Sequence, residues 1–441
     1  MAVSRLSRLA ARARVPVFPA LGMHGEPALH RLALTAGIEL VDSPRHASLL
    51  LVAGGVPPDR HAALRRVHDQ LPAPFATLWY RSEPLIELAG ATRVDELDAL
   101  PEALTTLHRE LMQGQRGSSP RLLPDEPPNP WEGLGDDGHG GEGMMGGVPY
   151  GRPMVMNMTD DLRDGLTLDS LTVTLGPFLP MLPPGLSAEV TLQGDLVYAW
   201  TTQDAPYPTA LGSVFFRALQ EPVPIAELER ARARHHLKRL HVALRLAGLE
   251  RLALQALRLA FEPRVEQERV TKLRRRLGRS GFFRLTTTGQ GRLEQGQARR
   301  VGGVAARAAG LEEDLRGRDA AYRRLGFTPI LQDGGDTGAR WRQTLAEIDQ
   351  SLQLAHQAER EGAHTEVIGS VETPCGPWGE HRSEDASRLL DELLPGLEWD
   401  EALSTLASLD LAAVSEWPQE TLQGSTEASG NGAESCEERR A

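Results

Sequence analysis

Cysteine is nearly absent from this chain of 441 residues, which contains two. Cys375 lies in a Thr-Pro-Cys-Gly-Pro turn, and Cys436 lies in a polar C-terminal stretch. An iron–sulfur cluster is normally held by four cysteine thiolates, so the chain lacks the ligands for a cluster of its own. The small number of thiols and the lack of a secretory leader also predict a reducing cytoplasm as the compartment.

Long apolar runs and an excess of basic residues are missing as well. No stretch reaches the roughly 20 consecutive apolar residues that a membrane-spanning helix needs. The formal net charge of −12 argues against general nucleic-acid binding, because that binding needs a basic surface to displace counterions. Hydrophobic residues at 40% and charged residues at 24% are otherwise typical of a soluble protein with two or three domains.

The first residues, 1–14, form a basic segment, and no acidic residue precedes Glu26. Arginines surround Leu6 and Leu9, a pattern that suits a short amphipathic helix. Such a helix would be a targeting segment, a membrane-surface contact or a docking element. The alternative is a frayed start before the first strand. The sequence leaves these alternatives open.

Residues 15–113 alternate between short apolar runs and helical patterns. This alternation predicts an α/β domain with a short parallel, flavodoxin-like sheet. Ligands of such sheets bind at the carboxyl ends of the strands, which here supply Met23, His24, Tyr80 and Arg81. The expected strands are 15–21, 38–41, 47–53 and 75–80, and the expected helices are 26–36, 59–70 and 100–112.

A stretch rich in glycine, proline and acidic residues predicts a linker over residues 114–150. Within it, Gly141-Glu-Gly143-Met-Met-Gly146 matches the GxGxxG fingerprint of dinucleotide-binding proteins. We reject this match, because the fingerprint works only between a strand and a helix, and no strand precedes Gly141.

The strand and helix patterns of residues 151–415 predict a second, α+β domain that is dominated by a helical bundle. Strands are expected over 166–175 and 188–198, on either side of a proline-rich loop. The tail, 416–441, is expected to be disordered because it is polar and lacks apolar periodicity. Helical periodicity covers 225–260, 265–277, 341–358 and 389–411.

Two segments of the first domain, Val41–Gly55 (VDSPRHASLLLVAGG) and Leu97–Leu104 (LDALPEAL), are distinctive. They resemble the cluster-binding small subunit that respiratory complex I shares with the nickel–iron hydrogenases. The cysteines of that family would fall within Leu21–Gly25, within Tyr80–Ser82 and near Ala99, and all four are missing. The resemblance therefore implies the fold of that subunit without its cluster.

A longer series of segments lies in the second domain. The series, in chain order, is Arg163–Asp169, Gly176-Pro177, Leu192–Asp195, Gly303–Gly310, Asp314–Arg316, Tyr322, Gly335-Asp336, Arg340, Glu347, Ser351-Leu352, Glu372–Gly376 and Leu403–Asp410. It resembles the 49-kDa-type subunit of complex I and the hydrogenase large subunit, the partners of the small subunit. The two resemblances together cover roughly residues 15–412.

The departures from these families restrict the chemistry. A nickel–iron site needs two Cys-x-x-Cys pairs, since soft thiolates hold those metals, and this chain has none. The complex I relative has a His-Pro-Ala-x-His-Gly loop in its quinone pocket, whereas the matching stretch here, Leu179–Pro184, has no histidine. We therefore assign no catalytic residue, no metal ligand and no cofactor. The candidates for a vestigial cleft are Met23, His24, Tyr80, Arg81, Leu179, Pro183, Arg307, Asp314, Arg316 and Asp336.

Three further groups of residues are interpreted without a ligand. His235, His236 and His241 lie in a helical pattern among arginines, and a metal site would need another ligand on the same face. We interpret them as part of a solvated or partner-facing basic face. Cys375 has no basic helix terminus beside it that the sequence can establish, so no reactive thiol is assigned. Asp314, Arg316 and Asp336 are expected to form a buried charge network with a scaffold role.

These resemblances imply a fusion of a cluster-less and a metal-less domain that dock on each other. The first hypothesis is a non-redox relative of the complex I and membrane-hydrogenase core. It would be a structural or coupling subunit on antiporter-like membrane proteins, at the inner face of the cytoplasmic membrane. The second hypothesis is a quinone-reactive subunit that receives electrons from clusters on other chains of an NADH:quinone oxidoreductase-like or hydrogenase-like complex. The third is a free-standing binding protein.

Overall fold

The structure, a computed structural model, describes most of the chain. The described residues are 5–88, 90–123, 157–160, 165, 167–285, 289–378, 386–412 and 414–415. The GxGxxG match at 141–146, the expected tail at 416–441 and Cys436 lie outside them.

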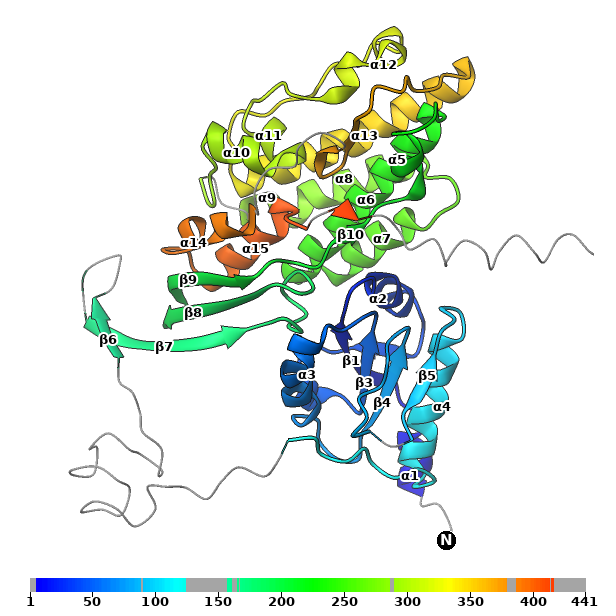
Figure 1. Ribbon diagram of the computed structural model, residues 1–441, viewed down its shortest axis with the longest axis vertical. Helices are drawn as coiled ribbons and strands as arrows, with labels where there is room; N and C mark the ends of the chain where they lie inside the picture. The colour runs from blue at the N-terminus through cyan, green and yellow to red at the C-terminus, as the bar shows by residue number, and fades with distance from the viewer. Residues whose placement is uncertain are drawn as a thin grey trace, which may run out of the picture.

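The N-terminal part is a parallel sheet of five strands in the order β2-β1-β3-β4-β5 (Figure 1). This order is that of flavodoxin-like sheets, so the predicted fold class is confirmed. The sequence did not predict β5. The elements are α1 (Arg5–Ala10), β1 (Val15–Leu21), α2 (Glu26–Ala33), β2 (Ile38–Leu40), η1 (Pro44–His46), β3 (Leu49–Ala53), η2 (Pro58–Arg60), α3 (His61–His68), β4 (Ala76–Tyr80), β5 (Thr92–Val94) and α4 (Leu100–Met112).

Strand β3 shows why this sheet forms, because all five of its residues are buried. Successive side chains of a strand point to opposite faces. Leu49 and Leu51 therefore pack with α2 and α4 on one face, and Leu50 and Val52 pack with α3 on the other. A strand covered by helices on both sides has to be apolar throughout, as this one is.

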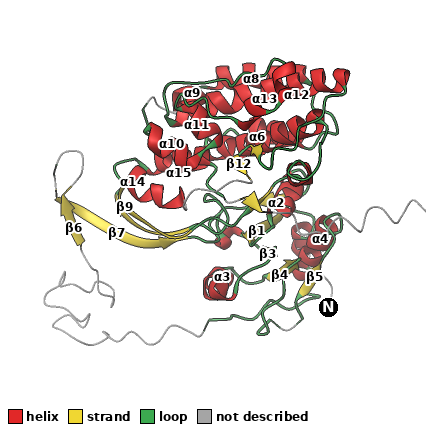
Figure 2. Ribbon diagram, turned by 45° about the horizontal axis from the view of Figure 1, so that its top comes forward, coloured by secondary structure: helices red, strands yellow, loops and turns green. Residues whose placement is uncertain are grey.

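The C-terminal part joins an antiparallel sheet to a helical bundle. The sheet has the order β6-β7-β8-β9, and β6 and β7 project away from the bundle (Figures 1 and 2). Its strands are β6 (Asn157–Asp160), β7 (Thr167–Leu175), β8 (Ser187–Gln193) and β9 (Leu196–Asp204). Two small strand pairs complete the β-structure: β10 (Thr209–Ala210) with β13 (Val414–Ser415), and β11 (Val371–Thr373) with β12 (Gly376–Trp378).

The bundle is built around α6 (Ile225–Leu246) and α13 (Thr337–Glu361). Its core contains Leu237 and Leu240 of α6 and Trp341 and Ile348 of α13. The other helices are α5 (Ser213–Arg217), α7 (Glu250–Ala260), α8 (Gln267–Ser280), α9 (Phe282–Leu285), α10 (Gln295–Val301), α11 (Gly303–Ala308), η4 (Leu315–Arg318), α12 (Ala320–Arg324), η5 (Ala386–Leu389), α14 (Leu390–Leu393) and α15 (Trp399–Leu409).

Three elements predicted as continuous are divided, each at a glycine in the left-handed region. Gly194, with φ of 64°, turns the chain between β8 and β9, where one strand was expected over 188–198. Gly248, with φ of 69°, separates α6 from α7, where one helix was expected over 225–260. Gly396, with φ of 89°, separates α14 from α15, where helical periodicity covered 389–411. Apolar periodicity does not register such breaks, because the pattern continues on both sides of the turn.

The two parts contact each other through α2, the loop after β2, η2 and the loop before β8. Phe178 of that loop is buried in the hydrophobic core of the N-terminal sheet. Arg245 of α6 donates a hydrogen bond to Asp42 at 3.0 Å, and Arg60 pairs with Asp204 of β9. Figure 1 shows α2 directly beneath the bundle. The part of the predicted linker that the structure describes continues along the N-terminal core, where Leu122 packs.

Helix α1 shows that the basic N-terminal segment contains a short helix. The carbonyl oxygen of Ala10 lies 3.3 Å from Nε2 of His108, so α1 lies against α4. Across the described ranges of the chain, none of the helices combines the length and apolar character needed to cross a bilayer.

Candidate functional site

The centre of the bundle holds a group of ionised side chains, which we call the charge cluster. Its members come from α6, α11, α13, β11, α12 and the turn around η4, so several elements meet there. For each member, the exposed fraction of the residue or of its side chain is at most 3%. The members are Glu229, Arg232, His236, Arg307, Asp314, Arg316, Tyr322, Glu347 and Glu372.

Arg307 of α11 contacts three carboxylates of the cluster. Its Nε and Nη2 donate to the two carboxylate oxygens of Glu347 at 2.6 and 2.9 Å. Its Nη1 lies 3.0 Å from Glu372 and 3.2 Å from Asp314. Burial opposes the charge of Arg307, but Glu347, Asp314 and Glu372 outweigh it and raise the pKa of the guanidinium. Arg307 is therefore permanently charged.

Arg316 forms the second fork of the cluster. Its Nε and Nη2 donate to Asp314 at 3.0 and 2.7 Å, and its Nη1 lies 3.4 Å from Glu229. The hydroxyl of Tyr322 donates to Glu229 at 2.7 Å. Burial and the neighbouring Glu229 raise the pKa of Tyr322 well above its ordinary value, so the phenol stays protonated and keeps donating.

The charges of the cluster do not balance. Its four carboxylates (Glu229, Asp314, Glu347 and Glu372) carry −4, and its three guanidiniums (Arg232, Arg307 and Arg316) carry +3, which leaves −1. The imbalance falls on Glu372, because burial, reinforced by Asp314, raises the pKa of its carboxyl to about 7. Burial lowers the pKa of His236, although Glu347 at 3.2 Å opposes that shift. Glu372 is therefore the group that takes up a proton near neutral pH.

A small pocket borders the cluster and reaches Glu372. Arg316, Tyr322 and Glu372 line it from the cluster, and Asp319 and Glu366 line it from outside. The pocket has room for about one water molecule. The pocket thus places space for about one water beside Glu372, whereas the remaining ion pairs hold α6, α11, α13 and η4 together.

The structure brings three of the predicted cleft residues together and leaves a fourth apart. Arg307, Asp314 and Arg316 belong to the charge cluster. Asp336 instead caps α13, where one carboxylate oxygen accepts from the backbone N–H of Ala339 at 2.7 Å. Its other oxygen accepts from the N–H of Gly289 at 2.8 Å.

The predicted residues of the N-terminal sheet lie at its carboxyl edge. Met23 pairs with Gly55 through two backbone hydrogen bonds of 2.8 and 3.0 Å. Tyr80 is buried, and the guanidinium of Arg81 lies 5.5 Å from the centre of its ring. His24 and Arg81 have φ of 62° and 48°, so the chain leaves both strand ends through a left-handed residue.

Leu179 and Pro183 lie in the loop between β7 and β8. Leu179 packs against the core that β8 and β9 share with α11 and α15. The N–H of Gly185 and the N–H of Leu186 donate to Pro177 and Pro183, so the loop is held by its own backbone. The loop therefore contributes apolar side chains such as Leu179 to the core of this part.

The metal centres of the resembling families do not fit these residues. The carboxyl edge of the sheet holds Met23, His24, Tyr80 and Arg81, none of which offers a thiolate. Cys375 is the single thiol among the described residues, and it lies at the turn between β11 and β12. Neither a four-thiolate cluster nor a site with four bridging and terminal thiolates can be assembled from it.

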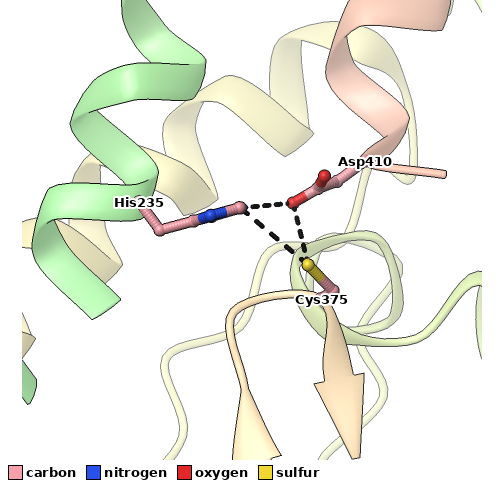
Figure 3. Close-up of side chains that lie close together, drawn as sticks. All are labelled: His235, Cys375 and Asp410. Atoms are coloured by element: carbon pink, nitrogen blue, oxygen red, sulfur yellow. Dashed lines mark hydrogen bonds and ion pairs between the residues drawn. The ribbon is translucent and has the colours of Figure 1, made fainter. Parts of the chain in front are cut away.

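Sequence reasoning missed a second convergence of side chains, which we call the His-Cys-Asp group (Figure 3). Nε2 of His235 lies 2.7 Å from Oδ2 of Asp410, and Sγ of Cys375 lies 3.4 Å from that oxygen. Sγ lies 3.9 Å from the same Nε2. Burial opposes ionisation of Asp410, but Arg239 and His235 hold its pKa well below the usual range. Asp410 is therefore ionised.

The interpretation of His235, His236 and His241 as part of a solvated or partner-facing basic face is wrong for His236 and His241, which are buried within this chain. Arg232, His236 and His241 are buried, with exposed fractions of 0%, 2% and 2%. Glu229 of α6 itself lies 3.4 Å from Arg232, whereas Glu347, which lies 3.2 Å from His236, comes from α13. No spacing within α6 could reveal Glu347.

Comparisons with known proteins concern mainly the second part of the chain. A protein-family model described as "Respiratory-chain NADH dehydrogenase, 49 Kd subunit" matches residues 256–388. One of the subunits of the NADH-quinone oxidoreductase of Geobacillus thermodenitrificans (strain NG80-2) is 27% identical over 166 residues. The aligned stretch spans 30% of this chain and 45% of that protein, which is less than half of its length.

Among solved structures, a chain of the membrane-bound sulfane sulfur reductase, described as an archaeal respiratory membrane complex, is 16% identical with a TM-score of 0.40. The alignment spans 55% of this chain and 96% of that chain. The match to the family model includes Arg307, Asp314, Glu347 and Glu372, so the region that holds most of the charge cluster is similar to the 49-kDa subunit of the respiratory-chain NADH dehydrogenase.

Proposed function

We propose that this protein is a non-redox relative of the complex I and membrane-hydrogenase core. In this role it is a structural or coupling subunit that docks on antiporter-like membrane proteins. The observation that carries the proposal is the combination of a 49-kDa-like region at 256–388 with a chain of two cysteines. The scaffold resembles an electron-transfer subunit, whereas the ligands that would carry electrons are missing.

The charge cluster supports a coupling role. Its ion pairs connect α6, α11, α13 and β11, and buried pairs of this kind fix an arrangement more than they stabilise it. Glu372 adds a proton-dependent charge at the centre of this arrangement. A change in the protonation of Glu372 alters the balance among Arg307, Arg316 and Asp314, and the protein can thereby respond to a proton without electron transfer.

The placement that we propose is peripheral, on the inner face of the cytoplasmic membrane. The resemblance of the first domain to the small subunit supports it, because the two subunits of that family act side by side. The contacts of Arg60 with Asp204 and of Asp42 with Arg245 hold the corresponding parts together here.

Chemical analysis of the purified protein tests the non-redox role. The chain is purified without oxygen and assayed for iron and acid-labile sulfide, with a cluster-containing small subunit as the positive control. We expect no stoichiometric iron and no paramagnetic signal from a bound inorganic centre. One or more iron atoms per chain would overturn the proposal.

Affinity isolation from native membranes tests the docking role. A tagged chain is expected to co-purify with multi-span membrane proteins in detergent. Recovery of the chain alone, at low and at high salt, would favour a free-standing binding protein and contradict the docking role.

The second candidate is a quinone-reactive subunit, which the similarity to a protein of an NADH-quinone oxidoreductase favours. Its cavity would lie near Met23, His24, Tyr80, Arg81 and the loop 179–184. Quinone reduction needs a hydrogen-bond donor near each carbonyl, and this loop offers no imidazole. Saturable binding of a quinone that Tyr80→Phe weakens, with Tyr198→Phe as the control, would favour this candidate.

A further inference from the structure

The His-Cys-Asp group does not have the geometry of a catalytic triad. In a triad the imidazole uses one nitrogen for the nucleophile and the other nitrogen for the acid, so that it can relay a proton. Here the same nitrogen, Nε2 of His235, faces both Sγ of Cys375 and Oδ2 of Asp410, at 3.9 and 2.7 Å. Figure 3 shows the three side chains pointing at a common centre. Three donor atoms directed at one point are suited to a metal ion.

The separations of these atoms lie close to those of a tetrahedral zinc site. Zn–S bonds of about 2.3 Å and Zn–N and Zn–O bonds of about 2.0–2.1 Å place the ligand atoms of a tetrahedral site roughly 3.3–3.6 Å apart. The three ligand atoms of the group all lie within 4.8 Å of one another. The sulfur–oxygen separation of 3.4 Å already fits, and the nitrogen–oxygen separation of 2.7 Å has to open by about 0.6 Å to reach the zinc geometry. The nitrogen–sulfur separation of 3.9 Å has to shorten by about 0.3 Å.

The surroundings are also those of a metal site. Arg239 lies 3.3 Å from Oδ1 of Asp410, so it orients the carboxylate and leaves Oδ2 directed at the centre. The side chains of His235 and Asp410 are 13% and 16% exposed, which leaves the centre open to an entering ion. The ligands come from α6, the β11–β12 turn and the C-terminal end of α15.

We propose that His235, Cys375 and Asp410 bind a divalent zinc ion, with water in the fourth position. A thiolate, an imidazole and a carboxylate are the donor types that zinc accepts, and oxygen-preferring ions such as Mg²⁺ and Ca²⁺ do not use thiolates. Binding releases the thiol proton of Cys375, and the ion replaces the hydrogen bonds of Asp410 to His235 and Cys375. The ion then connects three elements that are distant in the sequence. Because zinc has no redox chemistry, the site is compatible with a non-redox protein.

Cobalt titration of the full chain tests the site, because tetrahedral Co²⁺ reports a bound thiolate by its absorption. The protein is first treated with a chelator and then titrated with Co²⁺. We expect a thiolate-to-cobalt charge-transfer band that saturates at one equivalent and that one equivalent of Zn²⁺ removes. Absence of this band in the wild-type protein would overturn the proposal, whatever the variants do.

The two cysteines provide a matched control. Cys375→Ser is expected to abolish the band, whereas Cys436→Ser is expected to keep it. His235→Gln is expected to weaken Zn²⁺ binding by more than about tenfold. His364→Gln, which changes an exposed histidine outside the group, is expected to leave Zn²⁺ binding unchanged. The melting temperature of each metal-free variant is measured to show that it folds. A band that persists in Cys375→Ser, or that disappears in Cys436→Ser, would contradict the assignment.

Discussion

At the scale of single residues, the charge cluster depends on unequal numbers of acids and bases. Glu347 and Asp314 each meet an arginine through paired or short contacts, whereas Glu372 meets Arg307 through one oxygen at 3.0 Å. Its other oxygen accepts from the backbone N–H of Leu315 at 3.2 Å. Burial and the neighbouring charge of Asp314 raise the pKa of Glu372 to about 7, so within the cluster Glu372 is the carboxyl whose protonation changes in the physiological range.

Glu372→Gln is expected to change how stability depends on pH. The folded-state pKa of Glu372, about 7, lies above its ordinary value of 4.5, so the folded protein holds a proton that the unfolded chain releases. The stabilising contribution of this proton is complete below pH 4.5 and is lost as pH rises through 7. The variant should therefore gain about 2–3 kcal/mol relative to the wild type between pH 5 and pH 8. Urea unfolding at both pH values measures this difference.

The control for Glu372→Gln is Glu221→Gln, which changes an exposed carboxyl. The unfolding free energy of Glu221→Gln should equal that of the wild type at both pH values. A constant stability difference between Glu372→Gln and the wild type from pH 5 to pH 8 would show that Glu372 titrates at its ordinary value.

Arg307→Met is expected to cost about 3–5 kcal/mol of unfolding free energy, because it leaves buried carboxylates without their cation. The matched change is Lys272→Met, which removes the partner of Glu268 in an exposed pair on α8. Exposed pairs of this kind contribute little, so that variant should unfold at nearly the wild-type denaturant concentration. Chemical denaturation compares the two. Equal losses of unfolding free energy in Arg307→Met and Lys272→Met would mean that the charge cluster is not shielded from water.

At the scale of elements, the β11–β12 hairpin is central because it supplies both Glu372 and Cys375. It packs against the start of α11, where Gly303 has φ of 51°. A β-carbon on Gly303 would lie 2.8 Å from the backbone nitrogen of Gly376 and 2.8 Å from the carbonyl oxygen of Pro374. Backbone atoms cannot move aside cheaply, so this contact requires glycine.

Gly303→Ala is therefore expected to destabilise the protein by more than about 1 kcal/mol, through both the clash and the positive φ. Gly296→Ala in α10 is the control, because a β-carbon there meets open space. Alanine favours helix over glycine, so this control should be neutral or slightly stabilising. Thermal unfolding of both variants provides the measurement. Similar melting temperatures for the two would contradict the proposed close contact.

The elements also show what the sequence could predict. β1 and α4 have the predicted bounds, Val15–Leu21 and Leu100–Met112, because apolar spacing decides which residues a helix or a parallel strand buries. The His-Cys-Asp group could not be predicted in this way. Its three residues lie on elements separated by 140 and 35 positions, and only the packing of α6, the hairpin and α15 brings them together.

At the scale of the whole molecule, the two parts meet through histidines that burial keeps neutral. His30 of α2 lies against His241 of α6 and Phe261, with ring centres 6.4 and 5.9 Å apart. Burial lowers the pKa of His241 to about 4, and burial with the neighbouring Lys238 lowers the pKa of His30 well below 6.5. Protonation of either ring would place a new positive charge beside Lys238 and Arg245.

Acidification is expected to lower the free energy of unfolding, because His241 is buried beside the contact between the two parts. The folded pKa of His241 lies below its ordinary value of 6.5, so its contribution is complete above pH 6.5 and is lost as pH falls toward 4. Between pH 7 and pH 5 the loss is about 2 kcal/mol. His241→Gln should reduce this acid sensitivity, and His364→Gln should not. The measurement is the unfolding free energy of the wild type and both variants at pH 7 and pH 5. An unchanged pH dependence in His241→Gln would contradict the assignment.

The joining of the two parts in one polypeptide has a consequence for assembly. The ion pairs Arg60–Asp204 and Asp42–Arg245 form between segments that share a chain, so their effective concentration is set by the tether and not by the level of expression. Contacts that are too weak to hold two separate proteins together can therefore hold the two parts of one chain together. Any larger complex that binds one part of this chain therefore also contains the other part, in a one-to-one ratio.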